Sequence, residues 1–404
     1  MATRYGLFPI FAVLIEFLAS VFAFPASEAQ AGALGNWYDM GWVYRKKITI
    51  VYTNVSATLT NFTLLVSVTD TNLINTANGG HVAQSDGGDI IFANPQLTKL
   101  DHELEKYVDT NGQLIAWVRI PILSSNVTPY IYMYYGGKDP NNQWNKTGTW
   151  ETNAVMVQHL AETAGGKHYD STANANTGTV YGAIMGVETG KIDGADSFDG
   201  VDDYVDAGNA ASLNITNAIT IGAWVKWQGN GSGAWGYNEI VSKNGTALNN
   251  HGYELAVYND RRVLFVINNV GDADNYMVSD ITVTSNVWSH IGAKFDGDKL
   301  YVWVNGVEKT EDTAATSITI KAHTLKIGGG SGVGNFNGFI DEVRIYNRAL
   351  SVEEILSQYR NQNSPSTFYN VGLEENAPRI TLTSKKRELT LICTKFLENT
   401  QVLI

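Results

Sequence analysis

The stretch "GFIDEVRIYNRALSVEEI", residues 338–355, changes character halfway along. It begins as a strand and ends as a short helix. Ser351 is a fitting N-cap for that helix, and Glu354, three residues later, completes a capping box. The polar segment "NQNSPS" (361–366) follows, so we expect the helix to close a β unit.

Outward from this stretch, residues 151–365 carry many short apolar runs separated by turn residues. They include "AITIGAWVKW" (218–227), "YELAVYN" (253–259), "RVLFVINN" (262–269) and "KLYVWVNG" (299–306). Asp296-Gly297 and Asn305-Gly306 are strong two-residue turn signals on either side of one such run. The pattern predicts a β domain over 151–365.

A smaller unit precedes it. "YRKKITIVY" (44–52) alternates with period two, and "FTLLVSV" (62–68), "LIAWVRIPI" (114–122) and "PYIYMYYGG" (129–137) repeat the theme. Several strands without helical periodicity predict a β-sandwich over 37–140. The segment "KDPNNQWNKTGTW" (138–150) is typical of a linker.

Composition limits the class of protein. The chain has 404 residues, 44% of them hydrophobic and 17% charged, and its formal net charge is −12. Without a basic stripe to displace counterions from phosphate, nucleic-acid binding is excluded. Cys393 is the single cysteine, so no internal disulfide can form. We therefore predict an all-β protein whose domains are stabilised by their cores.

The two ends of the chain read differently from the middle. Residues 1–31 predict a signal peptide, with the apolar run "GLFPIFAVLIEFLASVFAF" (6–24) and a small-x-small site at 29–31. Glu16 interrupts the run, so an uncleaved membrane anchor is the alternative. Residues 376–404 are too short to bury a core and form a tail, either a fragment of a further β module or a frayed end. We expect a secreted or cell-surface protein.

Two family resemblances follow from these blocks. "WVYRKKITI" (42–50), "GGDIIF" (87–92) and "KLDHELEKY" (99–107) resemble DUF2341, an exported β module of unknown function. "DSTANANTGTV" (170–180), "SFDGVDDYVDAG" (197–208) and the opening stretch resemble a LamG-like jelly roll of the concanavalin A-like lectin/glucanase superfamily. That resemblance implies a two-sheet jelly roll, commonly with one structural Ca²⁺ and often with glycan binding.

A calcium site is expected at the acidic turn after Phe198. Ca²⁺ takes six to eight oxygens, and clustered aspartates beside a glycine supply both carboxylates and carbonyls. The resemblance implies Asp199 and Asp341 as side-chain ligands, the Gly200 region as carbonyl donor and Asp170 as a further candidate. The alternative is that these aspartates form Asx turns and cap strand ends. We interpret Asp202, Asp203 and Asp206 as solvated corner residues.

A glycan site is expected in the glycine-rich segment "WQGNGSGAWGYNE" (227–239). Sugar rings stack on exposed aromatic rings, and amide side chains form hydrogen bonds with the sugar hydroxyl groups. Trp235 is the best stacking candidate, with Tyr237, Asn238 and Asn250 as further ligand-binding residues. The alternative for Trp235 is that it folds back over its own sheet.

The sequence does not predict an enzyme. Glycosidases need paired carboxyl groups, and no such run lies on a predicted strand of the second unit. Asp101, Glu103 and Glu105 would share one strand face in the first unit, and we interpret them as a polar outward face. The favoured hypothesis is an exported binding or adhesion protein that recognises a glycan or a glycosylated surface protein. A structural spacer and a glycoside hydrolase are the alternatives.

Overall fold

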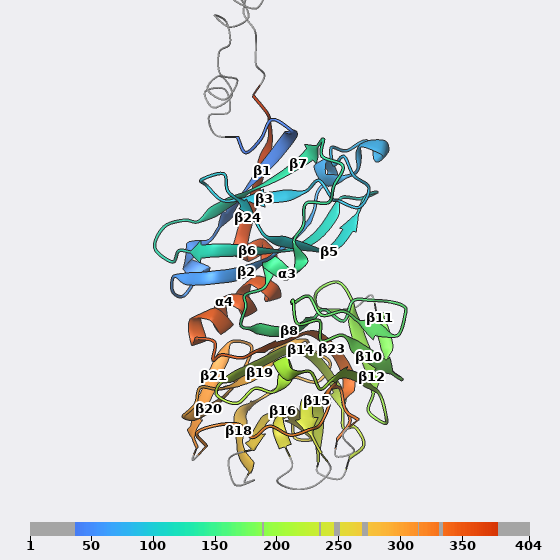
Figure 1. The fold of residues 1–404 in the computed structure, drawn as a ribbon, viewed down its shortest axis with the longest axis vertical. Helices are drawn as coiled ribbons and strands as arrows, with labels where there is room; N and C mark the ends of the chain where they lie inside the picture. The colour runs from blue at the N-terminus through green and yellow to red at the C-terminus, as the bar shows by residue number, and fades with distance from the viewer. Residues whose placement is uncertain are drawn as a thin grey trace, which may run out of the picture.

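The computed structural model describes residues 37–187, 190–233, 236–245, 251–268, 274–313, 315–330 and 334–378. The predicted all-β class is confirmed, since strands account for about 49% of the described residues and helices for about 10%. Figure 1 shows two stacked bodies, the N-terminal sandwich above and the larger jelly roll below. The predicted signal peptide, 1–31, and residues 379–404 of the predicted tail lie outside the described residues.

The first domain is a sandwich of a five-stranded and a three-stranded sheet. The larger sheet has the order β24-β1-β7-β3-β4, and the smaller one β2-β6-β5. The strands are β1 (Trp42–Ile50), β2 (Leu59–Thr69), β3 (Ile91–Ala93), β4 (Lys99–Leu100), β5 (His102–Val108), β6 (Gln113–Leu123), β7 (Tyr130–Gly137) and β24 (Tyr369–Asn376). Strand β24 comes from the far end of the chain and pairs with β1. The chain therefore leaves the first domain, builds the second and returns.

The second domain is a jelly roll of two eight-stranded sheets. The outer sheet has the order β18-β17-β16-β15-β22-β13-β10-β9, and the inner sheet β11-β12-β23-β14-β19-β20-β21, with β8 paired to β23. Its strands are β8 (Ala154–Gln158), β9 (Lys167–His168), β10 (Gly178–Tyr181), β11 (Ile184–Val187), β12 (Ala195–Asp199), β13 (Tyr204–Gly208), β14 (Ile219–Gly229), β15 (Tyr237–Asn244), β16 (His251–Tyr258), β17 (Arg262–Asn268), β18 (Asp274–Thr282), β19 (Ser289–Phe295), β20 (Lys299–Val304), β21 (Val307–Asp312), β22 (Leu325–Ile327) and β23 (Asn337–Tyr346).

The helices lie at the junction of the two domains (Figure 1). Among the described residues the α-helices are α3 (Lys146–Thr149), α4 (Val352–Asn363) and α5 (Pro365–Phe368). The capping box at the start of α4 is confirmed, because Ser351 accepts from the Glu354 amide and Glu354 accepts from the Ser351 amide. Near its other end, the Asn361 side chain bonds both backbone groups of Leu65 in β2. Helix α4 thus joins the second domain to the first. No helix in the described ranges is long and apolar enough to cross a membrane.

Strand β6 buries side chains on both of its faces. Leu114, Ala116 and Val118 belong to the core of the first domain. Ile115 and Trp117 point the other way, into a cluster with Tyr346 and other residues of the second domain. Period-two alternation sends successive side chains to opposite faces of a sheet. The inner sheet of the jelly roll is therefore covered by the first domain, while its outer sheet faces away from it (Figure 1).

Candidate functional site

The acidic turn between β12 and β13 is a tight hairpin corner. Gly200 has φ +77°, and a Cβ there would lie 2.8 Å from the Asn337 Cβ, so the position requires glycine. Asp199 is exposed and accepts from the Val201 amide at 2.8 Å. Asp203 is buried and accepts from the Asp199 amide at 2.8 Å. Two of the aspartates therefore shape the turn, and Asp203 is not the solvated corner residue that the sequence suggested.

Three carboxylates gather at this corner. Asp199, Asp202 and Asp203 each place an oxygen within 4.8 Å of the others. Burial raises the pKa of Asp203, and the neighbouring charges of Asp199 and Asp202 raise it further. The donors are oxygens alone, the type that Ca²⁺ prefers.

The other predicted metal ligands lie elsewhere. Asp199 pairs with Asn337, four residues before Asp341 along β23. Asp341 is fully buried, and its Oδ2 accepts from the backbone amides of Lys191 and Ile192 at 2.8 Å each. The Asp170 carboxylate accepts hydrogen bonds from the backbone amides of Val157, Thr172 and Asn176. Asp199, Asp341 and Asp170 therefore do not converge on one cation, and the ligand set implied by the resemblance does not fit.

The predicted glycan residues are only partly described. Trp235 and Asn250 lie outside the described residues. Tyr237 is 6% exposed and packs with Ala256 and Leu264. Asn238 is fully buried, accepts from the Gly231 amide at 2.6 Å and donates to the Val257 carbonyl at 2.9 Å. Tyr237 and Asn238 thus stabilise the sheet and its loop instead of facing an external ligand.

The outer sheet carries a row of polar side chains across five neighbouring strands. Glu254 of β16 lies opposite Ser242 of β15, Ser242 opposite Lys326 of β22, Lys326 opposite Asp206 of β13, and Asp206 opposite Thr179 of β10. Directly paired residues share one face of a sheet. Their chain neighbours Leu255, Val241, Ile327 and Val205 point into the core. The row therefore lies on the face that turns away from the first domain.

An aromatic pair lies beside this row. Tyr181 of β10 and Tyr204 of β13 stack with ring centroids 4.6 Å apart and an interplanar angle of 15°. The Lys326 ammonium lies 4.9 Å from the centre of the Tyr204 ring. Tyr181 is 47% exposed, so its ring offers an accessible face.

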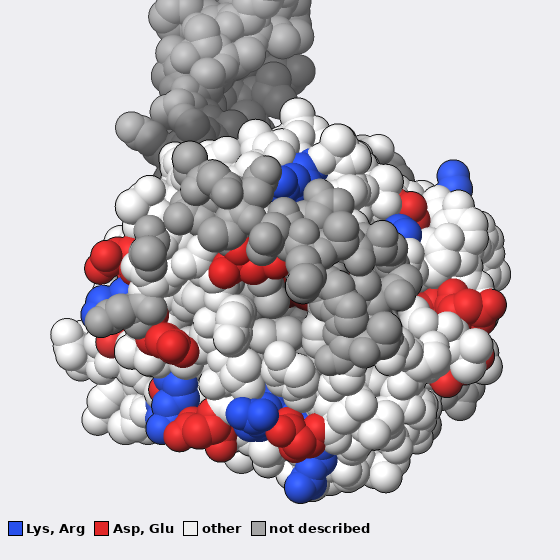
Figure 2. Space-filling model, turned by 90° about the horizontal axis from the view of Figure 1, so that it is seen from below, with Lys and Arg blue, Asp and Glu red and all other residues white. Residues whose placement is uncertain are grey.

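Figure 2 views the molecule from the end formed by the second domain. Lys and Arg alternate with Asp and Glu along its lower margin, further Asp and Glu lie near the centre and at the right, and other residue types cover most of the remaining described surface (Figure 2). Among the described residues visible there, no extended basic patch appears. A face of mixed charge is not suited to a polyanion.

Two acidic residues lie close together near the middle of the same sheet. One amide nitrogen, Asn244 Nδ2, lies 3.1 Å from Glu239 Oε1 and 2.9 Å from Glu254 Oε2. Both glutamates are fully buried. Burial raises the pKa of Glu254 well above its ordinary value, and the charge of Glu239 raises it further. The sequence did not reveal this pair, because its members lie on two different strands.

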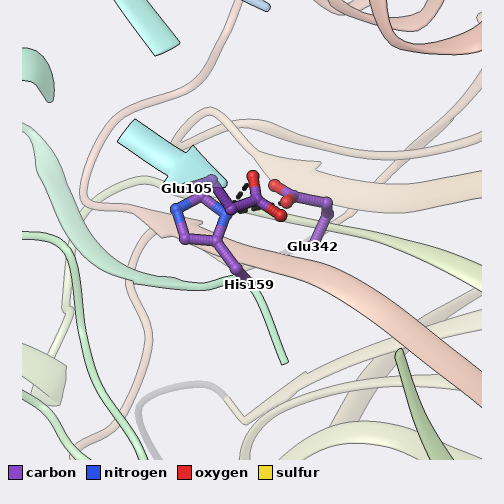
Figure 3. Close-up of side chains that lie close together, drawn as sticks. All are labelled: Glu105, His159 and Glu342. Carbon is purple, nitrogen blue, oxygen red and sulfur yellow. Dashed lines mark hydrogen bonds and ion pairs between the residues drawn. The ribbon is translucent and has the colours of Figure 1, made fainter. Parts of the chain in front are cut away.

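A second buried cluster lies between the two domains (Figure 3). It starts from a bulge in β23: Asp341 pairs with Trp224 and Arg344 with Gly222, and Glu342 has φ +55°. The extra residue makes Asp341 and Glu342 both face the first domain. Glu342 Oε1 lies 2.7 Å from Nδ1 of His159, which directly follows β8.

The first domain supplies the opposing carboxylates from β5. Glu105 Oε2 lies 3.5 Å from His159 Nδ1, and Glu103 Oε2 lies 3.5 Å from His159 Nε2. Trp117 donates to Glu105 at 2.6 Å, and Trp150 donates to Glu103 at 2.8 Å. Figure 3 shows the Glu105 and Glu342 carboxylates turned toward one another beside the His159 ring.

Arg344 closes the cluster from the side of the jelly roll. Its guanidinium donates to Glu342 Oε2 at 2.6 Å and lies 4.3 Å from the Trp117 ring centre and 4.8 Å from that of Trp150. Cations stack favourably on the faces of aromatic rings when water is excluded. The aromatic rings therefore shield the charged groups.

Burial and charge shift the pKa values in opposite directions. Desolvation alone would lower the pKa of His159, but Glu342, Glu105 and Glu103 outweigh it and raise that pKa well above the ordinary value. Desolvation would raise the pKa of Glu103, yet His159 and Lys146 lower it to about 2. Burial raises the pKa of Glu105 to about 8, and the nearby Glu342 charge contributes because it opposes the ionisation of Glu105.

This cluster corrects the interpretation of "LDHELEKY". Glu103 and Glu105 do share one face of β5, but that face is covered by the second domain: the Glu103 and Glu105 side chains are 6% and 3% exposed. Asp101 is exposed, as expected. The available signal was in the partner strand, since "LIAWV" (114–118) is apolar on both faces and such strands are buried on both sides.

The comparisons agree with the two-part architecture. Residues 199–356 match the family described as the concanavalin A-like lectin/glucanases superfamily. Residues 86–206 match DUF2341, a domain of unknown function. The second match begins inside the sandwich and ends at β13, so it includes Glu103, Glu105 and His159. A search of curated proteins found no match.

Solved structures of similar fold cover about half of this chain. The binding domain of botulinum neurotoxin serotype G is 15% identical, with a TM-score of 0.41 over 52% of this chain and 51% of its own. The binding domain of Paraclostridial Mosquitocidal Protein 1 is 14% identical, with a TM-score of 0.41 over 51% of this chain and 52% of its own. The chain thus spans about half the length of these structures. It joins a DUF2341 domain to a domain of the concanavalin A-like lectin/glucanase superfamily, as its sequence predicted.

Proposed function

We propose that this protein is an exported carbohydrate-binding protein that recognises glycans on the outer sheet of its jelly roll. The observation that carries the proposal is the exposed Tyr181 ring beside half-buried polar side chains of β10, β13 and β22, in a domain that matches the lectin/glucanase superfamily. The inner sheet is not available for recognition, because the first domain covers it. Export rests on the predicted signal peptide.

The chemistry of the surface suits a sugar ring. The exposed face of Tyr181 can stack on the apolar C–H face of a pyranose. Asp206, Lys326 and Thr179, all half-buried in the neighbouring polar row, can exchange hydrogen bonds with hydroxyl groups. Trp235, which lies outside the described residues, remains a stacking candidate from the sequence.

Calcium is part of the proposal only at the β12–β13 corner. Asp199, Asp202 and Asp203 would supply oxygen ligands there, and the cation would stabilise the hairpin that carries Tyr204. The observation that supports this placement is the close approach of the three carboxylates.

A glycan array tests the proposal. The full-length protein without its signal peptide should bind a defined set of glycans, and Tyr181→Ala should weaken binding at least tenfold, about 1.4 kcal/mol. Tyr52→Ala is the matched control, since Tyr52 is 43% exposed but lies in the first domain. Binding lost equally in both variants, or no binding by the native protein, would contradict the proposal. The second result would favour a structural spacer.

A glycoside hydrolase is the second candidate, and Glu239 with Glu254 favours it. The two carboxyl groups lie near one amide, and the pKa of Glu254 is raised well above its ordinary value, as a general acid requires. Glu103 lies in the separate interdomain cluster and serves as a control, while Glu239 and Glu254 are themselves fully buried, so turnover would require a substrate to reach them within the outer sheet. Turnover of a polysaccharide that is abolished by Glu254→Gln and by Glu239→Gln, but kept by Glu103→Gln, would establish this activity. Absence of turnover with the glycans found on the array would exclude it for those substrates.

A further inference from the structure

The interdomain cluster contains more buried acid than buried base. Four carboxyl groups gather there: the side chains of Glu103, Glu105 and Glu342 are 6%, 3% and 1% exposed, and Asp341 is fully buried. The buried cations facing them are His159 and Arg344. Lys146, with a side chain 38% exposed, lies at the margin, 3.4 Å from Glu103. Four ionised carboxylates would leave two negative charges that the buried cations do not balance.

Some polar atoms of the cluster have no hydrogen-bond partner. Glu105 Oε1, His159 Nε2 and Asp341 Oδ1 are buried without one among the described residues. A neutral carboxyl group normally donates its proton to an acceptor, and leaving a buried polar atom unbonded costs roughly 1–3 kcal/mol. Glu105 Oε1, in a side chain that is 3% exposed, therefore lacks a hydrogen bond to offset its burial.

The donor atoms are close enough to share one small cation. An oxygen of Glu105, an oxygen of Glu342 and a ring nitrogen of His159 all lie within 4.8 Å of one another. Ligands held about 2.0–2.2 Å from a tetrahedral cation lie roughly 3.5 Å apart. The 3.5 Å between His159 Nδ1 and Glu105 Oε2 meets this spacing, and the 2.7 Å between Nδ1 and Glu342 Oε1 would have to lengthen.

From these observations we infer that Glu105, His159 and Glu342 form a binding site for one divalent transition-metal cation that clamps the two domains together. A nitrogen ligand beside two carboxylates suits Zn²⁺ or Mn²⁺ better than Ca²⁺, which prefers oxygen ligands. The second shell is in place: Trp117 donates to Glu105, and Arg344 donates to Glu342.

The site draws its ligands from both domains. Glu105 comes from β5 of the sandwich, and Glu342 and His159 come from the jelly roll. A cation bound only by the closed arrangement would stabilise it by mass action. The inference does not depend on carbohydrate binding.

Metal-binding measurements on the full-length, chelator-treated protein test the inference. Titration with ZnCl₂ or MnCl₂ should give one tightly bound ion per chain, and CaCl₂ should not compete at equal concentration. Glu105→Gln and His159→Gln should each weaken this binding at least tenfold. Asp199→Asn is the matched control, because it removes a carboxylate from the separate corner between β12 and β13. Native protein that binds neither ion, or a Glu105→Gln variant with native affinity, would overturn the inference.

A measurement on the native protein avoids variants that fail to fold. The protein loaded with one equivalent of Cu²⁺ is examined by pulsed electron paramagnetic resonance. Nuclear modulation from an imidazole nitrogen is expected, because a site with a nitrogen ligand that holds Zn²⁺ binds Cu²⁺ at least as tightly. A spectrum with oxygen ligands alone would overturn the inference.

Discussion

Replacing His168 by glutamine should remove a pH-dependent part of the stability of the jelly roll. His168 is fully buried, and its two ring nitrogens lie 2.7 Å from Glu162 Oε2 and 2.7 Å from Asp196 Oδ2. Desolvation would lower its pKa, but the bonds to Asp196 and Glu162 outweigh it and raise the pKa from 6.5 to about 9. The imidazolium therefore links β9 to β12.

The size of the effect follows from this pKa. Each pH unit between the unfolded and folded pKa values corresponds to about 1.4 kcal/mol. The rise from 6.5 to about 9 gives about 3 kcal/mol as an upper limit, because the Glu162 side chain is 30% exposed and solvent screens it. A raised folded pKa stabilises the protein fully below pH 6.5, and this contribution is lost as the pH rises through 9.

Denaturant unfolding of the native protein and of His168→Gln at several pH values tests this reasoning. The difference in unfolding free energy should approach 3 kcal/mol near pH 6 and shrink steadily toward pH 9.5. A difference that stays constant over this range, or that grows with pH, would refute the assignment of a buried imidazolium.

Three further predictions concern packing, calcium and the helix cap. Gly292→Ala should lower the melting temperature and reduce the free energy of unfolding by about 1–3 kcal/mol, because the alanine Cβ would lie 2.1 Å from Trp303 Cζ2. An unchanged melting temperature would contradict this prediction. Added Ca²⁺ should raise the melting temperature of the native protein but not of Asp199→Asn, and a response of both argues against the hairpin corner. Ser351→Ala should cost about 1 kcal/mol in denaturant unfolding, since it breaks the capping box of α4, and a cost near zero would show that the cap contributes little.

Local features of this fold could be predicted from the sequence. The capping box at Ser351 and Glu354 and the turn at Asn305-Gly306 rest on short-range chemistry, and both are present. The order of the two domains followed from motifs spread over long segments. Each of these features can be recognised in the sequence because the residues of each single motif lie close together in the chain.

Features that depend on distant pairing were not predictable. Asp199 pairs with Asn337, four residues before Asp341 along β23, so the two carboxylates lie too far apart along the strand to share a cation. Strand β24 pairs with β1 although more than three hundred residues separate them, and nothing in its own composition names that partner. The burial of Glu103 and Glu105 depends on how one domain sits on the other, which no local pattern encodes.

The most direct test of the account is hydrogen–deuterium exchange of the native protein with and without a glycan identified on the array. The account predicts slower exchange in β10, β13 and β22, around Tyr181 and Lys326, and unchanged exchange in the sandwich. Slower exchange confined to the sandwich, with these three strands unaffected, would contradict the proposed recognition surface.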